Sequence, residues 1–113
     1  MHELSIAQNI VEIATQELHQ WKGAKVCSIS IELGEFSGVV KECLEFAFPE
    51  ACKGSVLEGC ALEVYCVDTV LRCLKCFNVD KAIDSSLLCR KCGSVQVEMI
   101  HGKELKITNM EIE

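Results

Sequence analysis

The sequence predicts an α+β fold in which a small sheet and two helices form one domain, and a cysteine-rich lobe is inserted into that domain. Three observations support this prediction. Two stretches space their apolar residues by three and four, as helices do. Other stretches alternate apolar and polar residues, as half-buried strands do. Four cysteines in two CxxC units stand between the second of these strands and the last one.

The elements follow in a simple order along the chain. Helical spacing predicts helices over residues 4–21 and 39–48, and Pro49 is expected to kink or end the second, since proline lacks an N–H. Alternation predicts strands over residues 27–33, 61–67 and 105–112, and a further alternating run over 95–99 that ends at His101 and Gly102. We therefore assign residues 1–69 and 102–113 to the α/β domain, and residues 70–101 to the inserted lobe.

Composition limits the classes of protein to which the chain can belong. Its 113 residues are 50% hydrophobic and 25% charged, values typical of a globular protein with one small core. The net charge of -6 argues against nucleic-acid binding as the main role. No apolar run is long enough for a membrane span, and no secretory signal is recognisable. We therefore expect a reduced, cytoplasmic protein.

The two CxxC units predict a structural zinc site. Cys73 and Cys76 form the first unit, Cys89 and Cys92 form the second, and two such units complete a tetrahedral four-thiolate shell for Zn(II). A closed shell leaves no position for a substrate, and it stabilises a lobe that is too small to fold unaided. We therefore predict no catalytic residue and no enzymatic activity.

Two other interpretations of the lobe remain open. The cysteines could form a redox pair or a regulatory switch. The lobe could instead be a nucleic-acid-binding ribbon, since basic residues lie in the CxxC turns (knuckles), but Phe77 is the one aromatic residue nearby for base stacking. The remaining five cysteines receive no chemical role. We expect Cys27, Cys43 and Cys66 to lie on apolar faces. We expect Cys52 and Cys60 to lie beside a loop.

The amino terminus offers a second set of metal donors. The amine of Met1, the backbone amides of His2 and Glu3, and the imidazole of His2 can provide four nitrogens in one plane. Such a donor set suits Ni(II) or Cu(II), whereas Zn(II) is expected to prefer the thiolates. By spacing alone, an exposed leader without a ligand role would be the better interpretation.

The sequence resembles the HypA/HybF family, the nickel metallochaperones of hydrogenase maturation. Besides the CxxC units, the resemblance is carried by residues 1–8 (MHELSIAQ), 33–40 (LGEFSGVV), 44–48 (LEFAF), 57–59 (LEG) and 102–105 (GKEL). It implies a nickel-binding domain with an inserted zinc ribbon, transient Ni(II) bound through His2 with Met1 and Glu3 as further donors, and structural Zn(II) on the four cysteines. It also implies two partners, a GTPase of the HypB type and a hydrogenase large-subunit precursor.

The chain departs from the family pattern at the start of the second helix. Some members use a carboxylate there as a nickel ligand, and Glu42 is the one local candidate in this chain. His101 lies near the expected junction of the two domains, where it could approach nickel or remain a solvated loop residue. The sequence leaves open whether the chain forms a homodimer, and whether a hydrogenase or a urease is served.

We therefore predict a metallochaperone that binds Ni(II) at His2 and delivers it for [NiFe] hydrogenase maturation. The alternative is a zinc-ribbon adaptor that binds protein or nucleic acid without nickel transfer.

Overall fold

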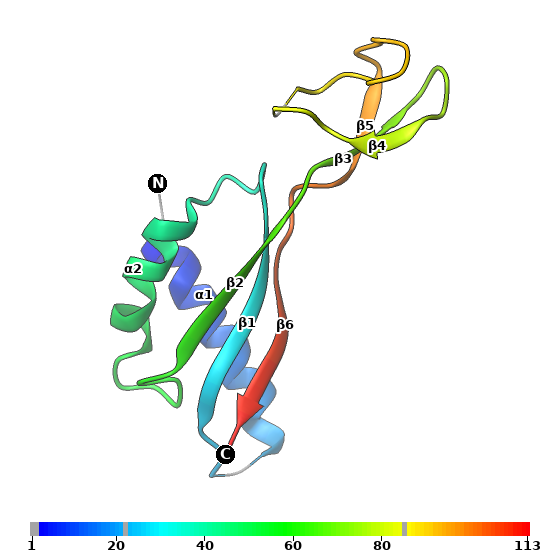
Figure 1. Cartoon of the computed structure of the whole chain (residues 1–113). Coiled ribbons are helices and arrows are strands. Elements are labelled where there is room, and N and C mark those ends of the chain that lie inside the picture. The colour runs from blue at the N-terminus through cyan, green and yellow to red at the C-terminus, as the bar shows by residue number, and fades with distance from the viewer. Residues whose placement is uncertain (1–2, 22, 85) are drawn as a thin grey trace. The chain divides into compact units, whose positions relative to one another are not determined.

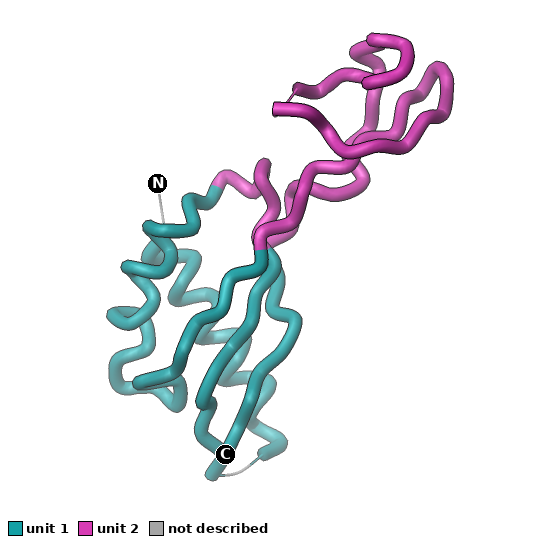
Figure 2. The backbone as a smooth tube through the Cα atoms, in the orientation of Figure 1, with its two compact units in different colours: residues 1–32, 39–65, 106–113 teal, residues 33–38, 66–105 magenta. Residues whose placement is uncertain are grey.

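A computed structural model describes residues 3–21, 23–84 and 86–113 of the chain (Figure 1). The chain divides into two compact units, which Figure 2 shows in different colours. We call residues 1–32, 39–65 and 106–113 the helical unit, and residues 33–38 and 66–105 the cysteine unit. The domain boundaries at 69/70 and 101/102 stay predictions. The segment 33–38, which the sequence placed in the first domain, belongs to the cysteine unit.

The helical unit packs two helices on one face of a three-stranded sheet (Figure 1). Helix α1 spans Glu3–Glu17 and continues as the 3-10 turn η1, Leu18–Gln20. The sheet has the order β2-β1-β6, with β1 at Val26–Gly34, β2 at Ala61–Val67 and β6 at Leu105–Ile112. The predicted strands 61–67 and 105–112 are confirmed to the residue. An α+β fold with two helices is therefore confirmed.

The strand directions follow from the connections. Strands β1 and β2 run the same way and are joined through α2, as parallel neighbours require (Figure 1). Strand β6 is antiparallel to β1, since Glu113 N–H donates to Lys25 O at one end and Gly34 N–H donates to Glu104 O at the other. The last strand of the chain therefore returns to the first sheet after the cysteine unit.

Helix α2, Lys41–Cys52, continues past the point where its end was predicted. Pro49 lies inside the helix and removes one N–H donor. Leu44, Phe48 and Cys52 recur every four residues and are all buried against the core. Burying this continuous stripe offsets the penalty of about 3 kcal/mol for an internal proline. Of the two outcomes expected at Pro49, a kink or an end of the helix, the end does not occur.

The core of the helical unit joins α1, α2 and β1. Its buried members include Ala7, Ile10 and Ala14 from α1, and Ile29 and Ile31 from β1. Neither these helices nor any other described helix combines the length and apolar character needed to cross a bilayer.

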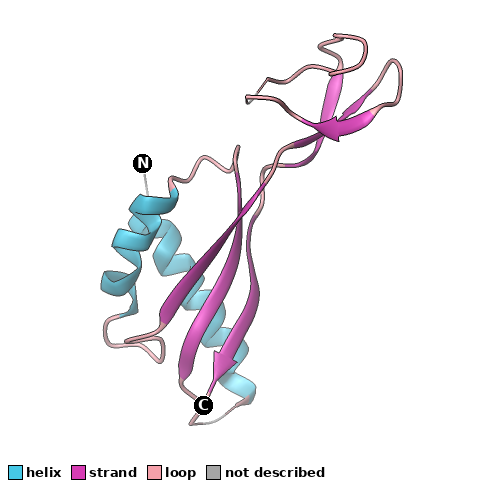
Figure 3. Cartoon of the chain, in the orientation of Figure 1, coloured by secondary structure: helices cyan, strands magenta, loops and turns pink. Residues whose placement is uncertain are grey.

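The cysteine unit contains a second three-stranded sheet, of order β4-β3-β5 (Figure 3). Its strands are β3 at Val70–Cys73, β4 at Val79–Lys81 and β5 at Val97–His101, and both pairings are antiparallel. Alternation before His101 indicated β5, but no pattern in the sequence indicated the two short strands β3 and β4. Strands of three and four residues carry too few positions for a periodic signal.

The segment 33–38 is held to the rest of the cysteine unit by backbone hydrogen bonds. Gly34 N–H donates to Glu104 O over 2.7 Å, and Phe36 N–H donates to Gly102 O over 2.6 Å. A Cβ on Gly34 would collide with the backbone of Gly102, so glycine is required for this close approach. The Thr69 hydroxyl adds a hydrogen bond of 2.6 Å to the Glu35 carboxylate. These contacts explain why the segment belongs to this unit.

Candidate metal centres

The first cysteine knuckle begins where β3 ends. The backbone N–H groups of Lys75 and Cys76 both donate to Cys73 Sγ, over 3.4 Å each. Phe77 N–H then donates to Cys73 O over 3.1 Å, and Cys73 N–H donates to Asn78 O over 2.9 Å. This tight turn directs two N–H dipoles at one sulfur, which stabilises its thiolate form.

The second knuckle repeats this pattern. Lys91 and Cys92 donate their N–H groups to Cys89 Sγ over 3.3 and 3.4 Å. Gly93 N–H donates to Cys89 O over 2.9 Å, and Cys89 N–H donates to Ser94 O over 2.9 Å. Two CxxC units at different places in the chain therefore adopt the same hydrogen-bonded turn.

The residue after each knuckle has a positive φ, and here the two knuckles differ. Gly93 has φ 78°, which glycine adopts freely, as its place after the second CxxC unit predicts. Phe77 has φ 63°, a left-handed conformation that costs an L-residue about 1–2 kcal/mol. The turn at Phe77 is therefore the more strained of the two.

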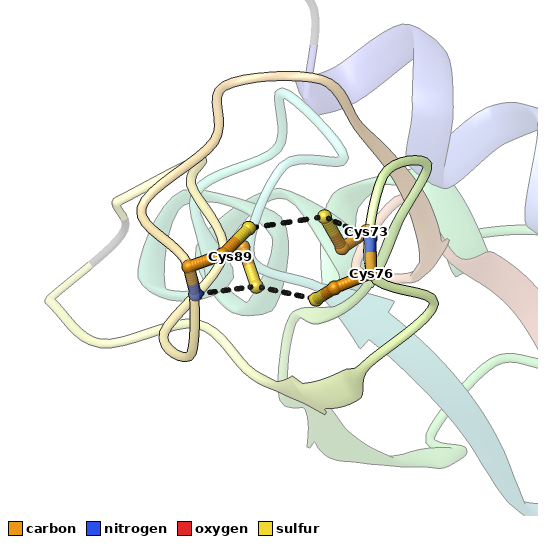
Figure 4. Close-up of side chains that lie close together, drawn as sticks. Cys73, Cys76 and Cys89 are labelled. Carbon is orange, nitrogen blue, oxygen red and sulfur yellow. Dashed lines mark hydrogen bonds between the residues drawn. The ribbon is translucent and has the colours of Figure 1, made fainter.

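The knuckles bring four sulfurs together (Figure 4). One ligand atom from each of Cys73, Cys76, Cys89 and Cys92 lies within 4.8 Å of all the others. The Sγ–Sγ distances are 3.6 Å for Cys73 and Cys92, and 3.5 Å for Cys76 and Cys89. Tetrahedral zinc with Zn–S bonds of about 2.3 Å requires sulfurs about 3.8 Å apart. A disulfide would require about 2.05 Å. The geometry is compatible with a structural zinc ion.

The knuckle hydrogen bonds also change the acidity of the thiols. The N–H groups of Cys92 and Lys91 lower the pKa of Cys89 to about 6, against a smaller opposing effect of burial. The N–H groups of Cys76 and Lys75 lower the pKa of Cys73 in the same way. One thiol in each knuckle is therefore more readily deprotonated, and the thiolate is the form that binds a metal.

The predicted amino-terminal site lies mostly outside the described residues, since Met1 and His2 are not among them. Glu3 is the first residue of α1, and its side chain is 9% exposed. Its Oε2 atom has no hydrogen-bond partner among the described residues. A shielded carboxylate oxygen is a strong acceptor for a cation or a charged donor. The residue next to His2 therefore belongs to a helix and has a carboxylate oxygen that is shielded from solvent.

The two further ligand candidates lie in different settings. Glu42 is exposed in the first turn of α2. His101 ends β5, and its Nδ1 lies 2.9 Å from Glu104 Oε2, while Gly102 N–H donates to Glu104 Oε1 over 2.7 Å. These two contacts lower the pKa of Glu104. Among described residues, the four cysteines are the one cluster of three or more metal-ligating side chains, and neither Glu42 nor His101 is part of such a cluster.

Three of the other five cysteines are not buried as their predicted apolar faces implied. Cys27, Cys43 and Cys66, which were assigned to apolar faces, are exposed, whereas Cys52 is buried and Cys60 is half-buried. Cys52 follows Phe48 on the buried stripe of α2, and that stripe extends beyond the predicted end of the helix. Burial raises the pKa of Cys52 to about 11, so this thiol behaves as an inert core residue.

The hydrogen bonds that support the cysteine sulfurs were not predicted from the sequence. The N–H groups that donate to sulfur belong to Lys75, Cys76, Lys91 and Cys92. Gly93, which permits a tight turn, was the one residue in the sequence that indicated such a turn. The pairing of His101 with Glu104 was also missed, although the spacing of three residues permits it.

Comparison with known proteins places these features in a family. Residues 1–112 match the family described as "Hydrogenase/urease nickel incorporation, metallochaperone, hypA". The hydrogenase maturation factor HypA of Rippkaea orientalis is 39% identical over 113 residues, which cover 100% of this chain and 96% of that protein. The same factor of Nostoc punctiforme is 40% identical with the same coverage.

Two solved structures share the fold. The Ni metallochaperone HypA from Helicobacter pylori matches with a TM-score of 0.74 and 24% identity, over 99% of this chain and 97% of that one. A second solution structure of a HypA protein matches with a TM-score of 0.75 and 25% identity, over 100% and 97% of the two chains. The sequence resemblance and the fold agree, and this chain belongs to the HypA family of hydrogenase/urease nickel-incorporation metallochaperones.

Proposed function

We propose that the chain binds Ni(II) as cargo through His2 and delivers it for [NiFe] hydrogenase maturation. The observation that carries the proposal is the family match from residue 1 to residue 112, which includes His2. The donors are the His2 imidazole, the Met1 amine and the backbone amides of His2 and Glu3, a nitrogen set suited to Ni(II). Helix α1 begins at Glu3 and anchors this donor set to a rigid element.

In this proposal zinc is structural and nickel is transient. Cys73, Cys76, Cys89 and Cys92 hold Zn(II) and stabilise the cysteine unit, while the nickel donors stand on the helical unit. The chain turns over no substrate and acts in the cytoplasm as a carrier. Its partners are a GTPase of the HypB type and the hydrogenase large-subunit precursor that receives the metal.

Nickel titration of the untagged, zinc-loaded protein tests the role of His2. The His2→Ala variant should lose most of the affinity, while His19→Ala, which changes another histidine near the end of α1, should keep it. Equal nickel affinity of wild type and His2→Ala would exclude His2 as a ligand. Nickel K-edge spectroscopy should report nitrogen donors, and an added residue before Met1 should weaken binding if the amine is a ligand.

The competing proposal is a zinc-ribbon adaptor without nickel transfer. It predicts no nickel binding at stoichiometric concentration, together with salt-sensitive binding of a nucleic acid or of a protein. A titration that shows stoichiometric nickel, lost in His2→Ala, would exclude this alternative.

A further inference from the structure

Phe77 combines two features that are unfavourable for stability. Its backbone has φ 63°, and its side chain is 72% exposed. The second knuckle has Gly93 at the corresponding position with φ 78°, so the same turn forms there without strain and without a side chain. Neither the conformation nor the exposure explains a phenylalanine at this place. Its ring is therefore available for a contact outside the described chain.

Two other exposed apolar side chains lie on the same pair of turns. Leu74 in the first knuckle is 51% exposed, and Val95 after the second is 77% exposed. Leu74 N–H donates to Gln96 O over 2.8 Å, which holds the two turns side by side. We call Leu74, Phe77 and Val95 the knuckle patch.

The charge next to the knuckle patch is mainly positive, although Asp80 follows the first knuckle and pairs with Arg90. Residues 73–79 and 86–97 contain Lys75, Arg90 and Lys91 and no acidic residue. Arg90 lies 3.4 Å from Asp80, whereas Lys75 and Lys91 form no ion pair with any residue that the structure describes. The chain as a whole has a net charge of -6. The patch is therefore a locally basic and apolar surface on an acidic protein.

We propose that the knuckle patch docks a protein partner of nickel transfer, whose surface offers an apolar pocket for Phe77 bordered by carboxylates. The inference rests on the proposed function for the identity of the partner. A protein is favoured over a nucleic acid because two of the three apolar members, Leu74 and Val95, have no aromatic face for stacking. A buried aromatic ring with a basic rim is the usual composition of a binding hot spot.

Isothermal titration of the full-length, zinc-loaded chain tests the proposal. The titrants are the purified GTPase and the purified large-subunit precursor of the same organism, and a single-stranded oligonucleotide serves as a third arm. The variants Phe77→Gly and Phe77→Asn both tolerate positive φ and remove the ring. Ile83→Ala, at an exposed residue of the same unit outside both knuckles, is the matched control.

At least one of the two proteins should bind Phe77→Gly and Phe77→Asn about 10-fold or more weakly than wild type. Ile83→Ala should bind like wild type, and Lys75→Glu should weaken binding most at low salt. Zinc content should stay the same in all variants, and the melting temperature of Phe77→Gly should be equal to or higher than that of wild type.

Three results would overturn the docking proposal: unchanged affinity of the Phe77 variants for both proteins, no binding of either protein by wild type, or oligonucleotide binding that the Phe77 variants lose. Nickel titration of the same samples reports separately on the proposed function, since no variant changes the amino terminus.

Discussion

The helical unit and the cysteine unit are stabilised by different means. The helical unit encloses an apolar core, whose largest fully buried side chains include Phe48, Ile29 and Leu44. In the described part of the cysteine unit, the buried hydrophobic residues are Leu33, Leu71, Cys73 and Cys89, and two of these four are the proposed metal ligands. A unit with so small a core depends on its metal and its backbone hydrogen bonds. We therefore expect the chain to combine a self-sufficient unit with one whose stability depends on a bound metal.

Removal of zinc should produce the largest difference in stability between the two units. Chelation, or the variant Cys89→Ser, should unfold the cysteine unit, because metal binding contributes about 10–16 kcal/mol to small zinc domains. Amide signals of α1 and α2 should persist in NMR spectra while those of β3 and β5 collapse. Cys27→Ser, at an exposed cysteine outside the cluster, is the control and should keep all signals. Simultaneous loss of both sets of signals would show that the units are not independent.

A cavity in the apolar core should have the opposite effect. Leu44→Ala removes a fully buried side chain and should destabilise the helical unit by about 2–5 kcal/mol. Zinc content should remain one per chain, since Leu44 belongs to the other unit. Urea unfolding followed by far-UV circular dichroism measures the first effect, and a zinc dye assay measures the second. Loss of zinc in this variant would contradict the division of the chain.

The two knuckles allow a matched exchange within the cysteine unit. Gly93→Ala should destabilise the unit by about 1 kcal/mol, because φ 78° strains an L-residue although no atom lies within 4 Å of the added Cβ. Phe77→Gly should stabilise it by a similar amount, since it removes the strain at φ 63°. Thermal unfolding of the zinc-loaded variants should show melting temperatures that move in opposite directions. A destabilised Phe77→Gly would mean that the ring contributes to folding, not to docking.

The smallest expected effect concerns the contact of Glu104 with His101 and Gly102. The pKa of Glu104 in the folded chain lies below its ordinary value of 4.5, so the contact stabilises the unit above that pH. This contribution is lost as the pH falls through the lowered pKa. Glu104→Gln should therefore cost about 0.5–1 kcal/mol at pH 7, a modest value because His101 is 55% exposed. The difference should vanish in strong acid, as stability curves at several pH values would reveal.

The sequence was sufficient for features that depend on short-range patterns. The CxxC spacing identified all four sulfurs that the structure brings together, and alternation located β2 and β6 to the residue. It was insufficient where burial depends on distant residues. Cys52 is buried because α2 continues through Pro49 along a stripe that faces the core, and Cys27 is exposed although its neighbours alternate as a buried strand does.

The sequence by itself determined the α+β class, the family and the four clustered cysteines, because periodicity and the spacing of CxxC units are local properties of the chain. Only the tertiary structure decided that the segment 33–38 belongs to the cysteine unit, that a carboxylate oxygen of Glu3 is shielded from solvent, and that Phe77 is strained and exposed. These features depend on contacts between residues that are far apart in the sequence, such as Gly34 and Gly102. No local sequence pattern predicts such contacts.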